Sequence, residues 1–478
     1  MLYIVIQFFC FNGKPLTISK ETTFITEPLL SSGKFVDYFK AVENEVYPKE
    51  MKTDDNGYRL IVQTLGVIDR EDWADKPTLV NLLNPLENLP ERVSQIYEKL
   101  GLEYDPDFKP TVKIESPKSF LQHLDPDGTK DLIKNYETFT EEHGYWTIQD
   151  FPQLETYIND NTAGLDILAA AVRKKTFCMP MVRYRDDAPL LEVMTPVEIE
   201  TMRAFARAVQ CRAFFRIGNG EIDKAIDDIL TLHYFARHIV KQGPLFDGMV
   251  GLSFELTAHR VGINAHPKHP AAKEQLQRLL NEREKLPPLC SFDESMKRER
   301  MFCLGLLQDM SRGIIYNNVF ERLPAIGDCH VYDYNEAMKV MNRCFDEAEK
   351  ADADMDTYIE KNLRSPSSLW TIIKRFPTAK GRGQWVGTMM TIILVPAAFE
   401  TGKNAWQRTD IQQDLMMKGT VQLIQEMKPS AQPATEVLLE APFADMYAEK
   451  KIVFCRSGAI KIKEEKKRSI NPPSGKEK

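Results

Sequence analysis

The chain has 478 residues, a length that predicts two or three domains. Hydrophobic residues make up 43% of it and charged residues 27%, which is typical of a globular protein and excludes a wholly disordered chain, a collagen and a multi-span membrane protein. The net charge of −7 gives no overall attraction to nucleic acid, so we expect no nucleic-acid partner.

The first segment, residues 1–16, begins with an apolar run over 1–11. A spanning helix needs about 20 apolar residues, so this run is too short to cross a membrane. Its β-branched and aromatic residues favour a buried strand, which would fit a cytoplasmic protein. Alternatively, the run is the end of a membrane anchor that starts upstream, which would predict contact with a membrane surface and a location in the cell envelope.

Residues 17–149 form a loop-rich region with short helices. The pattern predicts helices at 36–47, between residues 54–56 and Gly66, and at 90–100. The run Asp54-Asp55-Asn56 is an acidic start for the second of these helices and Gly66 a glycine stop. Three prolines at 103–117 indicate an irregular connection.

Residues 150–428 form the main helical domain. A long helical segment at 150–176 contains Gly164, which predicts a break there. The clearest pattern lies at 195–241, where apolar residues recur every three or four positions on both sides of residues 218–220, Gly-Asn-Gly. Thr195 and Glu198 have capping-box spacing. We predict two antiparallel helices joined by a short turn.

This predicted hairpin resembles one tetratricopeptide-type unit, with small and apolar residues such as Ala213, Gly220 and Ala225 near the expected offsets. A repeat array needs about three stacked units, and no second copy follows at a spacing of about 34 residues. The sequence therefore predicts one tetratricopeptide-like hairpin within an irregular helical domain.

Further helices are predicted along the rest of the domain, at 245–265, 271–286, 293–313, 335–363, 385–399 and 411–427. A short β-containing tail follows at 429–460, with its best strand at 452–455. Residues 461–478 are rich in Lys, Glu, Pro and Ser, which predicts a disordered basic tail. The predicted fold class is mainly α, built from irregular helical hairpins, with minor β structure near the C-terminus.

Common catalytic motifs are missing from the sequence. It has no Walker-type phosphate loop, no dinucleotide fingerprint, no nucleophile elbow and no H-E-x-x-H zinc motif. The eight cysteines show no C-x-x-C spacing, and we expect most of them to pack as small apolar side chains.

Glu255 and His259 are four residues apart and share one face of a predicted helix. Such a pair could bind a metal ion, act as acid and base, or form a polar contact between helices. Because no second pair with metal-ligand spacing is present, we predict no metal site and no cofactor. If the chain is an enzyme, its candidate catalytic residues are Glu255, His259 and His233.

Four arginines follow the first helix of the hairpin, namely Arg203, Arg207, Arg212 and Arg216. Acidic residues on the second helix, Asp223, Asp227 and Asp228, could pair with them across the hairpin. Alternatively, the arginines form an anion-binding groove for carboxylate or phosphate groups.

Three segments resemble an uncharacterised family of planctomycete proteins: residues 22–29 (TTFITEPL), 164–171 (GLDILAAA) and 212–244. The likeness extends over residues 17–410. Members tend to begin with one hydrophobic anchor before a Thr-Glu-Pro segment, which implies an anchor at residues 1–11. They tend to end in a strand-rich tail with Asp-Pro-Phe, where this chain has Ala-Pro-Phe at 441–443. The resemblance implies no activity and assigns no functional residue.

The sequence therefore favours a non-enzymatic helical scaffold or interaction protein, with a protein partner and with membrane association if residues 1–11 belong to an anchor. The alternative is an enzyme or small-anion-binding protein that uses the Glu/His group and the hairpin arginines.

Overall fold

Helices account for nearly all of the regular structure in the computed structural model, as the sequence predicts. The structure describes residues 14–67, 89–183, 188, 190, 199–264, 273–313, 332–350, 374, 378–426, 450–454 and 460–464. No helix within these ranges is long and apolar enough to span a membrane. The apolar run at 1–11 and the capping box at 195–198 lie outside the described residues.

The N-terminal half contains short helices and one longer one. Their bounds are α2 (Tyr38–Val46), the 3-10 helix η1 (Lys49–Lys52), α3 (Gly57–Leu65), α5 (Leu89–Leu100), α6 (Pro117–Leu124), α7 (Leu132–His143) and α8 (Leu154–Val172). The predicted start and stop of α3 are confirmed, and Asn56 is the residue of the 54–56 run that caps the helix: its side chain accepts a hydrogen bond from the Tyr58 amide, and Gly66 ends the helix with φ +76°.

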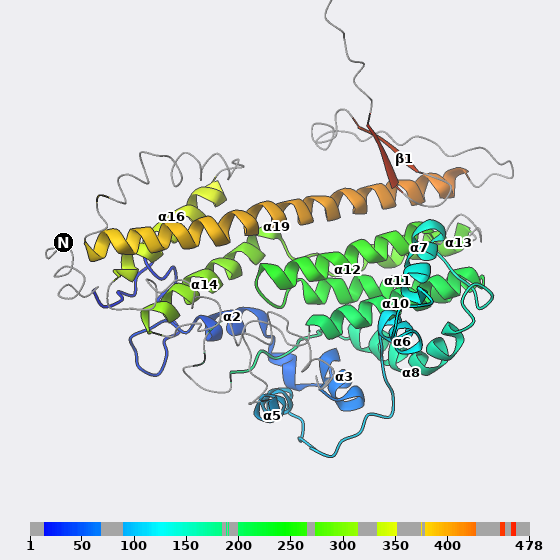
Figure 1. Cartoon of the computed structure of the whole chain (residues 1–478), viewed down its shortest axis with the longest axis horizontal. Coiled ribbons are helices and arrows are strands. Elements are labelled where there is room, and N and C mark those ends of the chain that lie inside the picture. Colours follow the sequence, from blue (N-terminus) through cyan, green and yellow to red (C-terminus); the bar gives the residue numbers. More distant parts are fainter. Residues whose placement is uncertain are drawn as a thin grey trace, which may run out of the picture.

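The C-terminal half contains longer helices. Their bounds are α10 (Ile199–Gly218), α11 (Ile222–Ile239), α12 (Leu245–Asn264), α13 (Lys273–Glu284), α14 (Phe292–Ser311), α16 (Tyr334–Lys350) and α19 (Ala379–Glu426). A two-stranded antiparallel sheet, β1 (Lys450–Phe454) with β2 (Ile460–Glu464), follows α19 in the sequence and is drawn above the C-terminal part of this helix in Figure 1. Strand β2 includes residues of the predicted disordered tail, in a stretch where Ile and Lys alternate.

The predicted hairpin is present as α10 and α11, joined by three residues. Gly220 has φ +74°, a conformation that favours glycine, and the Glu221 amide donates to the Arg216 carbonyl to close the turn. Helix α11 packs along both α10 and α12, so these three helices form the centre of the molecule (Figure 1). The likeness of the α10–α11 hairpin to a tetratricopeptide unit stays a prediction.

The predicted break at Gly164 is wrong, because α8 runs through this residue without interruption. A Cβ atom at position 164 would lie 2.4 Å from the Lys113 carbonyl oxygen. Glycine is therefore required here by the close approach of the 112–114 backbone to the helix, and helical hydrogen bonding continues through it.

The predicted helices at 385–399 and 411–427 are a single helix, α19, which is 48 residues long and includes Pro396. A proline inside a helix removes one backbone donor and crowds the carbonyl four residues earlier, at a cost of about 3 kcal/mol. Tertiary packing of the helix can outweigh such a local cost. Helix α19 lies along α16, α14, α12 and α13 and extends along the whole helical body (Figure 1).

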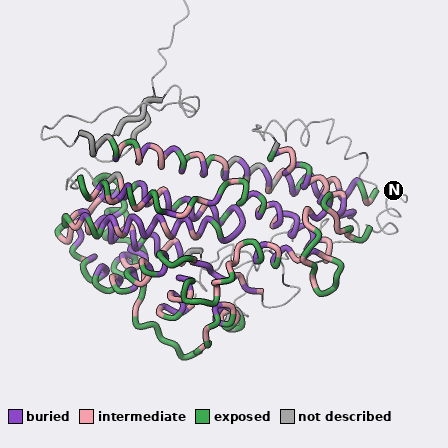
Figure 2. The backbone as a smooth tube through the Cα atoms, turned by 180° about the vertical axis from the view of Figure 1, so that it is seen from behind, coloured by how far each residue is buried: buried purple, intermediate pink, exposed green. Residues whose placement is uncertain are grey.

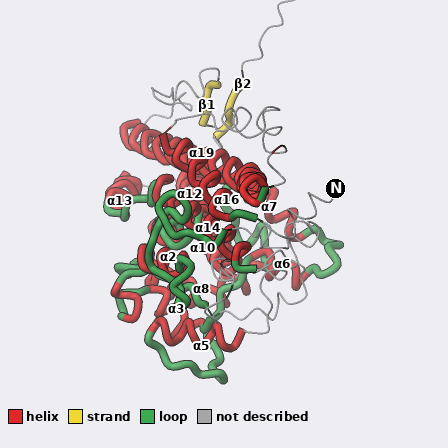
Figure 3. Tube along the Cα trace, turned by 90° about the vertical axis from the view of Figure 1, so that its left-hand side faces the viewer, coloured by secondary structure: helices red, strands yellow, loops and turns green. Residues whose placement is uncertain are grey.

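Two hydrophobic clusters lie side by side under α19. One is built mainly from α3, α5, α8 and α10–α13, and the other mainly from α2, α14, α16 and α19. Figure 2 shows the buried backbone concentrated on the central helices and the exposed backbone at the periphery. The end-on view of Figure 3 places α3 and α5 on the side opposite α19. The predicted loop-rich region 17–149 contributes helices to both clusters.

Candidate functional site

Three candidate catalytic residues meet inside the helical body. His233 lies on α11, and Glu255 and His259 lie one turn apart on α12, which packs against α11. All three side chains have 0% of their surface exposed. Among the described residues, this is the only group of three or more His, Cys, Asp or Glu side chains whose possible metal-ligand atoms all lie within 4.8 Å of one another.

The distances within this His/Glu group are short. His233 Nδ1 lies 3.0 Å from Glu255 Oε2, and His259 Nε2 lies 3.4 Å from Glu255 Oε1. The imidazole rings of the two histidines are 5.1 Å apart, centroid to centroid. Neither nitrogen of His233 is aligned for a hydrogen bond, and the same is true of Glu255 Oε2.

Two arginines that the sequence analysis missed surround the group. Arg237 Nη2 donates to Glu255 Oε1 over 3.2 Å. Arg283, on α13, has its Nη2 3.1 Å from His259 Nε2 and its Nη1 3.5 Å from the Met416 sulfur. Arg237 lies one helical turn after His233, a spacing visible in the sequence, whereas α13 reaches the site only through tertiary packing.

Burial determines the charge state of the group. It lowers the pKa of His233 to about 4 and lowers that of His259, so both imidazoles are neutral at pH 7. Burial raises the pKa of Glu255, but the neighbouring imidazoles outweigh this and hold it well below its usual value. The group therefore presents one carboxylate and two neutral imidazoles.

Arg212 and Arg216, two of the four hairpin arginines, form ion pairs across the hairpin. Arg212 Nη2 and Arg216 Nη1 lie 2.7 Å and 2.8 Å from the two oxygens of Asp228, which is fully buried. Arg212 also bonds to Asp166 on α8 at 2.7 Å. Both guanidinium groups thus have protein carboxylates as partners.

The other two hairpin arginines lie apart from this pair. Arg203 stacks over the Phe246 ring at 5.8 Å. Arg207 lines a cavity of about 240 Å³ between α6, α7 and α10, which also carries Lys118, Arg260 and Glu141. The structure does not bring the four arginines together in one groove, and anion binding by them stays a prediction.

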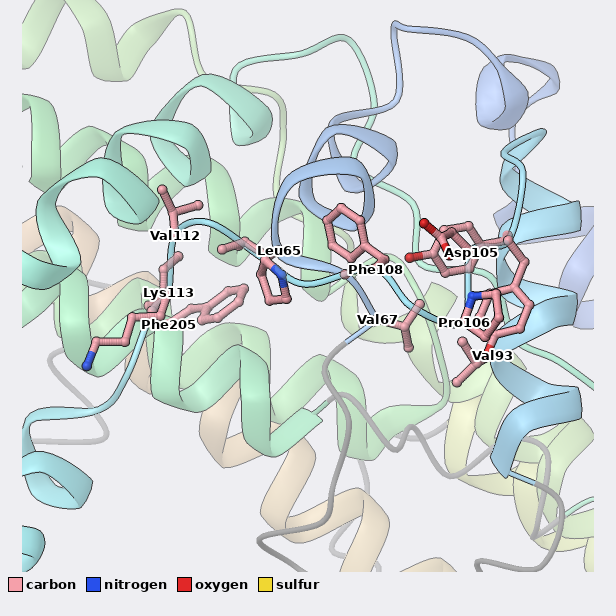
Figure 4. A pocket seen from close by; sticks show the side chains of 14 residues that line it. Leu65, Val67, Val93, Asp105, Pro106, Phe108, Val112, Lys113 and Phe205 are labelled. Atoms are coloured by element: carbon pink, nitrogen blue, oxygen red, sulfur yellow. The ribbon is translucent and has the colours of Figure 1, made fainter.

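A larger cavity of about 380 Å³, which the sequence analysis missed, opens between α3, α5, α10 and residues 104–114. Apolar side chains dominate its lining, and the residues concerned are Leu65, Val67, Val93, Tyr97, Tyr104, Phe108, Val112, Ile114 and Phe205. In Figure 4, Phe205 faces the cavity from one side, whereas Val67, Val93 and Pro106 lie on the other. We call this cavity the apolar pocket.

One acidic residue, Asp105, lines the apolar pocket, and two more acidic residues flank it in the sequence. Within the described part of the chain, Glu103, Asp105 and Asp107 are exposed and form no ion pair, and Lys109 is the only basic residue between 103 and 109. Lys113 is also in the lining, and its Nζ lies 3.7 Å from Glu115 Oε2 and 3.7 Å from Asp160 Oδ2. Its ammonium group points away from the other labelled side chains in Figure 4.

Comparison of the chain with protein-family models, with curated proteins and with solved structures finds no match.

Proposed function

We propose that this chain is a helical interaction protein whose apolar pocket receives a partner segment with a large apolar side chain next to a basic residue. The observation that carries the proposal is the pocket itself, a cavity of about 380 Å³ with a mainly apolar lining that includes the carboxylate of Asp105. This volume is within the range of about 300–1,000 Å³ that is typical of binding pockets.

The lining supports an apolar occupant. Leu65, Tyr97 and Phe205 are part of the hydrophobic core, so they form a fixed surface at the base of the pocket. Phe108 at the rim is 36% exposed and would lose this exposure when the pocket is filled. Complete burial of one large apolar side chain stabilises a complex by about 1.5–3 kcal/mol.

The rim supports a basic neighbour in the partner segment. Asp105 lines the pocket and forms no ion pair within the described part of the chain, whereas Lys113, the basic residue of the lining, already lies near Glu115 and Asp160. A Lys or Arg beside the apolar side chain would gain a favourable contact with Asp105, and the negative charge of Asp105 would favour its association. An acidic segment would be repelled.

The alternative, catalysis by Glu255, His259 and His233, is weakened by burial. A general acid or base must come within hydrogen-bond reach of its substrate, and these three side chains have no exposed surface. Of the four arginines proposed to bind an anion, Arg212 and Arg216 are paired with Asp228 instead.

A selection from a random peptide library on the purified chain tests the proposal. We expect the enriched peptides to combine an aromatic or large aliphatic residue with a nearby Lys or Arg. Phe108→Ala should weaken the binding of such a peptide about tenfold, measured by fluorescence anisotropy, because it removes one wall of the pocket. Asp105→Asn should weaken it less and reduce its salt dependence.

Phe246→Ala is the matched control, because Phe246 is also exposed, at 48%, but does not line the apolar pocket. Its peptide affinity should equal that of the unmodified chain. Equal losses in Phe108→Ala and Phe246→Ala, or enrichment of acidic peptides, would contradict the proposal.

A further inference from the structure

His233 lacks the hydrogen bonds that a buried imidazole normally makes. Its side chain has no exposed surface, and neither ring nitrogen has a hydrogen-bond partner. Burying a polar group without a partner costs roughly 1–3 kcal/mol. A further ligand on Nδ1 would remove part of this cost, and Nδ1 is the nitrogen that faces Glu255.

The distances around Glu255 match those between ligands of one metal ion. Ligands at tetrahedral Zn²⁺, with bonds of about 2.0–2.1 Å, lie about 3.3 Å from one another. The two nitrogen–oxygen distances here are 3.0 Å and 3.4 Å. The shorter one joins atoms that are not aligned for a hydrogen bond, so hydrogen bonding does not account for their approach.

We propose that His233, Glu255 and His259 form a buried site for a divalent transition-metal ion of the Zn²⁺ type. Two imidazoles and one carboxylate are ligands that Zn²⁺ accepts, with a fourth position for water. This site would be an addition to the apolar pocket and independent of it. It also departs from the sequence-based expectation that the chain holds no metal.

The surroundings of Glu255 support this assignment. Arg237 donates to Oε1 and fixes the orientation of the carboxylate, so that each of its oxygens faces an imidazole nitrogen. Hydrogen bonds from outside the coordination sphere orient metal ligands in this way, and their loss costs about 10–100-fold in metal affinity.

Arg283 opposes the metal ion, because its guanidinium adds positive charge beside His259 Nε2. Its own partners are weak: an imidazole nitrogen and the Met416 thioether, while its Nε has none. The side chain therefore loses little when it turns aside. Arg283 fills the cation position until a metal ion displaces it.

Because the site has no exposed surface, the ion would enter while the chain folds or opens. The experiment therefore refolds the full chain with Zn²⁺ or with Mg²⁺, removes free metal and measures bound metal by mass spectrometry. We expect one Zn²⁺ per chain, no Mg²⁺, and a higher unfolding temperature with Zn²⁺. Co²⁺ in its place should give the strong visible absorption of a tetrahedral site.

His233→Gln should abolish the Co²⁺ absorption and weaken Zn²⁺ binding at least tenfold. His238→Gln is its matched control, because His238 is a partly buried histidine on the same helix but outside the group. It should bind Zn²⁺ like the unmodified chain. Arg283→Met should bind Zn²⁺ about tenfold more tightly or better, because it removes the opposing charge.

Any of three results would overturn the proposal. The refolded chain takes up no Zn²⁺, His233→Gln keeps the stoichiometry and the Co²⁺ absorption, or Arg283→Met binds Zn²⁺ no more tightly than the unmodified chain. The Arg283→Met comparison keeps the test decisive even if His233→Gln does not fold, which circular dichroism would reveal.

Discussion

At the scale of single residues, Asp228 holds the hairpin together. Its carboxylate is fully buried and balances both Arg212 and Arg216. Removing one partner from a buried ion pair leaves an uncompensated charge, which costs about 3–5 kcal/mol. We expect Asp228→Asn to lower the free energy of unfolding by about 3 kcal/mol, since Asp166 still balances part of the charge on Arg212. Urea denaturation measures this change.

The neighbouring Asp227→Asn is the matched control. Asp227 is 47% exposed and pairs with Arg278 at the surface. Exposed ion pairs contribute about 0–1 kcal/mol, so this variant should keep nearly full stability. Similar losses in the two variants would show that the buried pairing does not control stability.

His238 makes the stability of the fold depend on pH. It lies at the C-terminal end of α11, and its Nε2 donates to the Val172 carbonyl at 2.9 Å. Burial lowers its pKa from 6.5 to about 4. Below pH 6.5 the unfolded chain therefore binds a proton that the folded chain does not, and stability falls as the pH drops towards 4. The loss from this residue amounts to roughly 3 kcal/mol.

His238→Gln keeps an amide donor but cannot titrate in this range. We expect its unfolding free energy to fall less steeply between pH 6.5 and 4 than that of the unmodified chain, as followed by urea denaturation at a series of pH values. Identical slopes for both proteins would contradict the role given to His238.

At the scale of elements, Gly164 couples α8 to the backbone that lines the apolar pocket. A Cβ atom there would meet the Lys113 carbonyl carbon at 3.1 Å as well as its oxygen, and neither can rotate away. Alanine favours a helix over glycine by about 1 kcal/mol, but the overlap reverses this gain. Gly164→Ala should destabilise the fold by about 1–3 kcal/mol in thermal unfolding.

Gly262 on α12 provides the contrast. The nearest atoms to a Cβ there belong to the end of the flexible Met416 side chain, at 3.4 Å. Gly262→Ala should therefore be neutral or more stable by up to about 1 kcal/mol. If Gly164→Ala also proves neutral, the close approach of residues 112–114 to α8 is wrong.

Local patterns in the sequence predict most of the helices because caps and apolar spacing act over a few residues. Asn56 and Gly66 mark both ends of α3, and Gly220 marks the turn of the hairpin. The same patterns fail at Gly164 and Pro396, where residues that usually end helices lie inside them. At Gly164 a distant segment decides the outcome, through a contact that local spacing cannot reveal.

At the scale of the whole molecule, the candidate sites arise from packing between distant segments. Glu255 and His259 are four residues apart on α12, so the sequence alone predicts that they lie side by side. Arg283 reaches them from another helix, which the sequence does not predict. The apolar pocket combines residues between positions 65 and 205, including an irregular connection with no periodic pattern. Such a cavity has no signature in a single sequence.

A crystal structure of the chain with a peptide selected from the library tests the proposed function most directly. We expect the large apolar side chain of the peptide to lie in the apolar pocket between Phe205 and Val67, with the basic residue of the peptide beside Asp105. A peptide bound on another surface, with this pocket unchanged, would contradict it.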